Sequence, residues 1–174
     1  MQGLVSIIKG EFANTIKQFW EELENLLGFK PVNPLIPHFS WFGAENFPVS
    51  ELKSIIDKNS DIKVNLKVKC GGISIFPSEE LIIYIPIVVS ERLIKVHSEL
   101  YNKLIVPIET NILNNNYYYF PNNWVPHITL VQNNHFKELP TNILKKILEM
   151  NDYYEFEVGN LSLIDTKGKI FFEL

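Results

Sequence analysis

The 174-residue sequence has few of the residues that build disulfides, cysteine-rich metal sites and broad nucleic-acid surfaces. Its one cysteine, Cys70, excludes an internal disulfide and is expected to be a small buried hydrophobe. Arg92 is its one arginine, and the net charge is −4. Because proteins that hold long duplexes usually carry a strong basic excess, we expect no such partner. The charge does not exclude a small phosphate ligand, which needs only a few local hydrogen-bond donors.

Long apolar runs are also missing. The longest, "LIIYIPIVV" at 81–89, is far shorter than the roughly 20 residues that span a bilayer. The start, "MQGLVSIIKGEF", lacks the basic segment of a signal peptide. We therefore expect a cytoplasmic protein without a membrane partner, and a monomer. The length fits one domain, or two small lobes that share a core.

Hydrophobic spacing predicts strands and helices that alternate along the chain. Gly28 is the expected C-cap of the first helix and Ser50 the expected N-cap of the second. Two hairpins are expected, one through "FPSEE" and one at Lys167-Gly168. The expected helices are 12–27, 49–59, 90–106 and 138–149, and the expected strands are 4–8, 35–42, 62–70, 73–76, 81–88, 125–131, 153–164 and 168–173.

Two halves of the chain match. Each runs strand, helix, Pro-His strand, helix, strand, which predicts a duplicated α+β fold with two antiparallel sheets facing a central cleft and helices outside. We expect a single domain, 1–174, with pseudo-symmetric lobes of about 1–75 and 76–174 that can exchange strands. The loop at 111–124 is long for a compact domain and fits either a lid or a tolerated surface insertion.

The duplication is clearest in "IPHFSWFG" at 36–43 and "VPHITLVQ" at 125–132. Side chains alternate along a strand, so His38, Ser40 and Phe42 are expected on one face. His127, Thr129 and Val131 follow the same rule in the second copy. Each strand then offers an imidazole and a hydroxyl about 7 Å apart.

A phosphodiester suits two such pairs. Displacement at phosphorus needs one oxygen deprotonated and another protonated, and an imidazole with a pKa near 6.5 performs either task. The two hydroxyls would donate to the non-bridging oxygens. This chemistry calls for no metal and no cofactor, and we expect none. A lone histidine in an apolar strand is more often a structural residue, but two copies at matching places favour function.

At these residues the sequence resembles the 2H phosphoesterase family, which includes 2′-5′ RNA ligase-like proteins and cyclic nucleotide phosphodiesterases. His38-Phe39-Ser40 and His127-Ile128-Thr129 match its two His-x-Thr/Ser motifs, and "GISIFPSEELIIYIPI" at 72–87 resembles the strand pair between them. The resemblance implies a bilobal fold and metal-independent chemistry on 2′,3′-cyclic phosphates or 2′-5′ linkages. Serine in place of the commoner threonine at position 40 is a mild departure.

Other candidates have a structural and a functional interpretation. Lysines at 63, 67 and 69 share a strand face that is either solvated or phosphate-attracting. The aromatics Tyr84, Tyr117, Tyr118, Tyr119 and Trp124 fit core packing better than base stacking. His97 and His135 are expected to be exposed, and Gly71-Gly72 is expected to form a bend.

The sequence therefore predicts a hydrolase for a nucleotide or an RNA end, in which His38 and His127 are catalytic and Ser40 and Thr129 bind phosphate. RNA ligation by the same proton transfers, and a non-catalytic module that binds nucleotides or RNA ends, are the alternatives.

Overall fold

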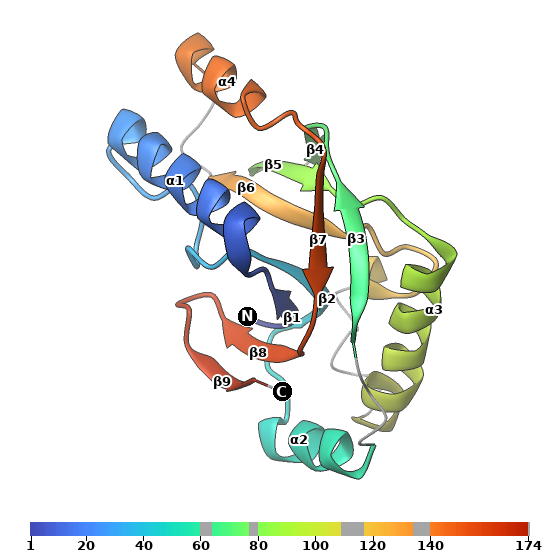
Figure 1. Ribbon diagram of the computed structural model, residues 1–174. Helices are drawn as coiled ribbons and strands as arrows, with labels where there is room; N and C mark the ends of the chain where they lie inside the picture. The colour runs from blue at the N-terminus through green and yellow to red at the C-terminus, as the bar shows by residue number, and fades with distance from the viewer. Residues whose placement is uncertain (60–63, 77–79, 109–116, 134–139, 174) are drawn as a thin grey trace.

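The computed structural model describes residues 1–59, 64–76, 80–108, 117–133 and 140–173 (Figure 1). Its helices and strands alternate largely as the hydrophobic spacing predicts. Among the described residues, no helix is long and apolar enough to cross a membrane. The helices are α1 (Gly10–Leu27), α2 (Val49–Lys58), α3 (Glu91–Leu100) and α4 (Thr141–Leu148). The strands are β1 (Gln2–Ile7), β2 (His38–Ala44), β3 (Leu66–Cys70), β4 (Ser74–Phe76), β5 (Leu81–Pro86), β6 (His127–Asn133), β7 (Tyr154–Val158), β8 (Ser162–Asp165) and β9 (Ile170–Glu173).

The described strands form antiparallel sheets of four, three and two strands. One sheet has the order β2-β1-β8-β9. A second has the order β4-β5-β6, and β3 pairs with β7. A bridge between Cys70 and Ile87 joins the end of β3 to the chain that continues from β5. Each Pro-His strand, β2 or β6, is therefore an edge strand beside the strand that begins its own half, β1 or β5.

Gly71 and Gly72 form the expected bend between β3 and β4. Gly72 has φ +78°, a left-handed conformation that glycine adopts without strain. A Cβ at Gly71 would lie 2.6 Å from the Tyr153 ring. Because the chain bends here, β3 pairs with β7, whereas β4 pairs with β5.

The C-terminal strands do not stay with the half of the chain that precedes them. β7 pairs with β3, whereas β8 pairs with β1 and β9 completes that sheet. The single strand expected over 153–164 is therefore wrong, because the chain changes sheets at Gly159-Asn160. Asn160 has φ +43°, a left-handed conformation that asparagine tolerates better than most residues.

Amphipathic helices cover the sheets. Helix α1 ends at Leu27, and Gly28, with a φ of +76°, is the expected C-cap. Helix α2 has Pro48 at its N-cap, so the expected cap at Ser50 is wrong. Ser90 caps α3 by accepting a hydrogen bond from the Leu93 amide. The chain then continues through a π-helical turn over Tyr101–Ile105 and a 3-10 turn over Val106–Ile108.

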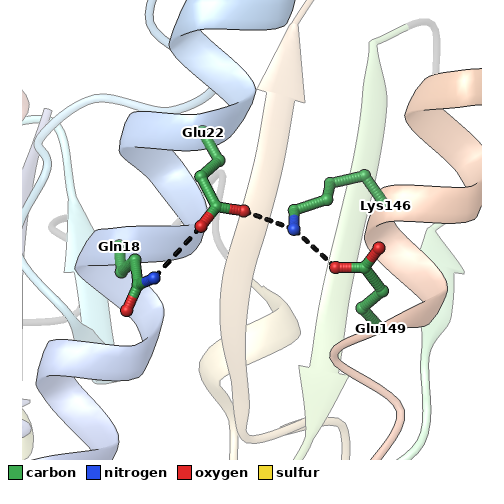
Figure 2. A network of polar contacts seen from close by, with 4 residues as sticks. All are labelled: Gln18, Glu22, Lys146 and Glu149. Atoms are coloured by element: carbon green, nitrogen blue, oxygen red, sulfur yellow. Dashed lines mark hydrogen bonds and ion pairs between the residues drawn. The ribbon is translucent and has the colours of Figure 1, made fainter.

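Helices α1 and α4 lie side by side (Figure 1) and are joined by an ion pair. Lys146 on α4 pairs with Glu22 on α1 and with Glu149, the C-cap residue of α4, and Gln18 donates to Glu22 (Figure 2). These groups hold the second helix of the C-terminal half against the first helix of the chain.

Candidate active site

The two Pro-His strands, β2 and β6, lie against each other although they belong to different sheets. His38 begins β2 and His127 begins β6. In each case the residue before the histidine, Pro37 or Pro126, accepts a backbone hydrogen bond from just beyond the neighbouring strand, at 2.8 and 3.0 Å. The duplicated motifs thus enter their sheets in the same way.

Both strands carry a bulge directly after the hydroxyl residue. In β2 the register pairs Ser40 with Val5 and Phe42 with Leu4, so Trp41 is skipped. In β6 it pairs Thr129 with Tyr84 and Val131 with Ile83, so Leu130 is skipped. A bulge adds one residue to one strand and bends it locally. The bend comes directly after the His-x-Ser and His-x-Thr triplets. The regular alternation of side chains between the two faces of each strand ends there.

The bulge corrects one expectation about the strand face. His38 and Ser40 are half-buried and alternate with fully buried Phe39, as predicted. Phe42 was expected on the His38 face, but it is fully buried and packs on His97, as does Trp41. The extra residue shifts the alternation by one, so that side chains beyond the bulge change face. Val131, expected on the His127 face, lies beyond the second bulge and is also fully buried, so that expectation is wrong as well.

The catalytic candidates are held in one tautomer by matching bonds. His38 Nδ1–H donates to the Ile36 carbonyl at 2.6 Å, and His127 Nδ1–H donates to the Val125 carbonyl at 2.7 Å. A carbonyl can only accept, so the proton of each neutral ring must sit on Nδ1. Nε2 is then the atom of each imidazole that can take or give a proton.

The same surroundings lower both histidine pKa values. Burial is the largest cause for His38 and for His127, and the carbonyl bond of each ring opposes it. The charge of His127 also lowers the pKa of His38. The two imidazoles therefore lie within electrostatic reach of each other, which is what a shared substrate would need.

The Ser40 hydroxyl has a partner that sequence reasoning did not assign. A hydrogen bond joins the hydroxyls of Ser40 and Tyr119, and burial raises the pKa of Tyr119. Tyr119 lies in a 3-10 turn over Tyr117–Tyr119 and packs across Gly43 of β2. A Cβ at Gly43 would lie 2.7 Å from the Tyr119 ring. The glycine three residues after Ser40 is the signal in the sequence that a ring crosses the strand there.

The second motif has aromatic neighbours. The rings of Phe76 and Tyr84 stack with centroids 4.1 Å apart, and both contact the His127 ring, at 4.9 and 5.0 Å. Tyr84 is also the register partner of Thr129. The surroundings of the two motifs therefore differ, with a tyrosine hydroxyl beside Ser40 and an aromatic pair beside His127.

Several other candidates have structural roles. Lys67 forms a 2.9 Å ion pair with Glu155, and Lys69 lies opposite Glu155 in the register of β3 and β7. This exposed face carries charges of both signs, which favours the solvated interpretation. Cys70 is fully buried, as expected, and burial raises its pKa to about 12.

His97 was expected to be exposed, and that expectation is wrong. The side chain is fully buried on α3 and stacks on Trp124 with centroids 4.0 Å apart. The packing role expected for Trp124 is confirmed by the same contact. Lys63 and His135 lie outside the described residues. Within the described residues, no group of three or more His, Cys, Asp or Glu side chains could hold a metal ion.

Comparison with known proteins identifies the family. The family model of the 2′-5′ RNA ligase superfamily matches residues 12–170. The chain belongs to this superfamily. Both His-x-Ser/Thr motifs lie inside the matched range, and membership supports an activity of the 2H phosphoesterase type.

A solved structure agrees with this assignment at the level of the fold. The crystal structure of TT0787 of Thermus thermophilus is similar, with a TM-score of 0.66 at 13% sequence identity. The match covers 100% of this chain and 97% of that one. No match was found among curated protein sequences. The fold of this solved structure therefore extends over the whole chain.

Proposed function

We propose that the protein is a metal-independent phosphoesterase for the 2′,3′-cyclic phosphate or 2′-5′ phosphodiester of a nucleotide or an RNA end. The observation that carries this proposal is the matched pair of Nδ1–carbonyl bonds. They give both imidazoles the same tautomer, with Nε2 as the proton-transfer atom. Two such rings within electrostatic reach suit a reaction that needs one base and one acid.

Opening of a cyclic phosphate illustrates the proposed division of work. The neutral imidazole takes a proton from water at Nε2 while the water oxygen forms a bond to phosphorus. The bond from phosphorus to the 2′ or the 3′ oxygen breaks, and the protonated imidazole gives that oxygen its Nε2 proton. The ring that acted as base ends protonated and the other ends neutral, so the pair returns to its starting state by exchanging one proton with solvent.

The hydroxyls of Ser40 and Thr129 serve the phosphate in this scheme. Each follows its histidine by two residues and is half-buried. Donation to the non-bridging oxygens would stabilise charge that grows there during displacement. The bond between Tyr119 and Ser40 is compatible with this role, because a neutral tyrosine can donate to Ser40 Oγ and leave the serine proton for a phosphate oxygen.

The test is turnover of nucleoside 2′,3′-cyclic phosphates and of 2′-5′-linked dinucleotides by the wild type and by folded His38→Ala, His127→Ala and double variants. Each single change should lower kcat by orders of magnitude, and the double change should cost little more, because the two rings act as a unit. Ser40→Ala and Thr129→Ala should each cost about 2 to 4 kcal/mol in the barrier. Ser50→Ala, an exposed serine on α2, is the matched control.

Near-native rates in both single histidine variants would contradict the two-histidine mechanism. Joining of RNA ends rather than cleavage would show that the same proton transfers run in the ligase direction. Tight nucleotide binding without turnover would replace the enzyme with a binding module.

A further inference from the structure

Three ring N–H groups donate to backbone carbonyls at the two bulges. Trp124 Nε1–H donates to the Ser40 carbonyl at 3.0 Å, and the His97 ring bonds the next carbonyl, that of Trp41, through Nε2 at 3.2 Å. In the second motif Trp20 Nε1–H donates to the Leu130 carbonyl at 3.0 Å. The carbonyls of both skipped residues are therefore held by side chains from outside their sheets.

The helices that provide these donors correspond in the duplicated fold. Trp20 lies on α1, which follows β1, and His97 lies on α3, which follows β5. Each helix reaches the Pro-His strand of the other sheet. Trp41 and Leu130 are fully buried, and a buried carbonyl without a donor is costly, so these bonds stabilise the bulges.

In the first motif the two donors form one stacked unit. The rings of Trp124 and His97 are inclined by only 13° and bond consecutive carbonyls of β2. Trp124 lies three residues before His127 and one before Val125, whose carbonyl accepts from the His127 ring. The indole bond therefore ties the segment that orients one catalytic histidine to the backbone of the other motif.

His97 is suited to this role because its ring is neutral, and a neutral ring can be buried with a single hydrogen-bond partner. It carries its proton on Nε2, since it bonds a carbonyl, and Nδ1 has no partner among the described residues. Burial lowers the pKa of His97 to about 4, so the ring keeps this state at neutral pH.

We propose that Trp124 and His97 are positioning residues that fix the spacing between the His38–Ser40 motif and the His127 motif by holding the Ser40 and Trp41 carbonyls. The proposal rests on the function proposed above. Neither ring needs to touch the substrate. Loss of either donor should let the bulge relax, and a displacement of about 1 Å in such a site can cost about 100-fold in rate.

The test combines donor removal with rescue. Trp124→Phe removes the indole N–H and keeps an aromatic ring on His97, while His97→Leu removes the ring donor. His97→Gln places an amide N–H near the position of Nε2. We expect kcat on a nucleoside 2′,3′-cyclic phosphate to fall about 10- to 100-fold in the first two variants, with a smaller change in KM, and to recover in His97→Gln.

Phe12→Leu is the control for general packing. It removes a buried ring that contacts Tyr154 and Phe156 of β7, and neither of these residues binds the Ser40 or the Trp41 carbonyl. All variants are compared at a temperature below their unfolding midpoints. If Phe12→Leu lowers kcat as much as Trp124→Phe, the effect is general packing and the proposal is wrong.

A second readout does not depend on turnover. Imidazole titration by NMR gives the change in the His38 pKa on His127→Gln, which measures how strongly the two rings interact. This change should shrink when Trp124→Phe is also present. An unchanged interaction, with or without loss of kcat, would overturn the proposal. A wild type without turnover but with a Trp124-dependent interaction would reject the proposed function and keep the positioning role.

Discussion

Gly43 shows how one missing side chain shapes the candidate site. The Tyr119 ring lies where a Cβ at position 43 would be, 2.7 Å from the nearest ring carbon, and its hydroxyl bonds Ser40. Gly43→Ala should therefore push the ring away and lower the free energy of unfolding by about 1 to 3 kcal/mol, a usual cost of overpacking. Chemical denaturation of the variant measures this loss.

Two further variants separate overpacking from other effects of the alanine. Tyr119→Ala added to Gly43→Ala removes the clash, so the double variant should lose less than the sum of the two single changes. Gly159→Ala is the control, because its Cβ would meet only the Val64 carbonyl, at 4.0 Å. A fully additive double variant would show that Tyr119 does not occupy this place.

His97 makes stability depend on pH. Its pKa is about 4 in the folded chain and about 6.5 when unfolded, so the unfolded state binds more protons between these values. The contribution of the neutral ring is complete above pH 6.5 and is lost as the pH falls toward 4. It amounts to about 3 kcal/mol by the pKa difference.

Denaturation of the wild type and of His97→Gln between pH 7 and pH 4 measures this contribution. The wild type should lose more stability than the variant across that window. His38 and His127 also have lowered pKa values, so their protonation also reduces stability as the pH falls. This loss is the same in the wild type and in His97→Gln, so it does not affect the difference between them. Parallel stability curves would mean that His97 titrates normally and is not buried as a neutral ring.

At the level of elements, local patterns predicted most of the strands and helices. The apolar period of α1, its glycine cap and the β4–β5 and β8–β9 hairpins depend on neighbouring residues, and all are confirmed. The alternation of His38, Phe39 and Ser40 is local in the same way. Pairing with distant strands is not local, which is why the change of sheet at Gly159-Asn160 was missed.

The bulges at Trp41 and Leu130 could not be predicted from either strand alone. An apolar residue after the hydroxyl fits both regular alternation and a skipped position, and only the register with β1 or β5 decides between them. The burial of His97 also depends on a contact with a distant strand. A histidine on an amphipathic helix is usually exposed, and here the Trp41 carbonyl provides the partner that makes burial possible.

At the scale of the whole molecule, the duplication extends beyond the two motifs. The β2-β1-β8-β9 sheet and the β4-β5-β6 sheet each place a Pro-His strand at an edge, and each of these strands has a bulge after the hydroxyl residue. A helix from the other half donates to the carbonyl of each skipped residue. The β8–β9 hairpin joins the sheet of β1, so the end of the chain completes the sheet that its beginning starts. The site therefore depends on both halves together.

Metal removal tests the chemistry of the assembled site. If two imidazoles provide both proton transfers, turnover of a 2′,3′-cyclic phosphate should be unchanged after treatment with EDTA. Added divalent ions should then give no gain beyond their effect on ionic strength. Loss of activity with the chelator, restored by one divalent ion, would show that a metal ion takes part in the reaction.

The pH dependence of the rate follows from the pair as a unit. The reacting form has one neutral and one protonated imidazole, so kcat/KM should follow a bell-shaped curve between the two apparent pKa values of the pair. Burial lowers both values below the usual 6.5, and the charge of His127 lowers that of His38 further. The maximum of kcat/KM should therefore lie on the acidic side of pH 6.5. The value of kcat/KM should then fall toward neutral pH, where both rings lose their protons.

Initial rates at low substrate concentration and constant ionic strength measure this curve. A maximum above pH 7 would mean that the rings are more exposed to water, or more strongly stabilised as cations, than the two carbonyl bonds and the surrounding packing allow.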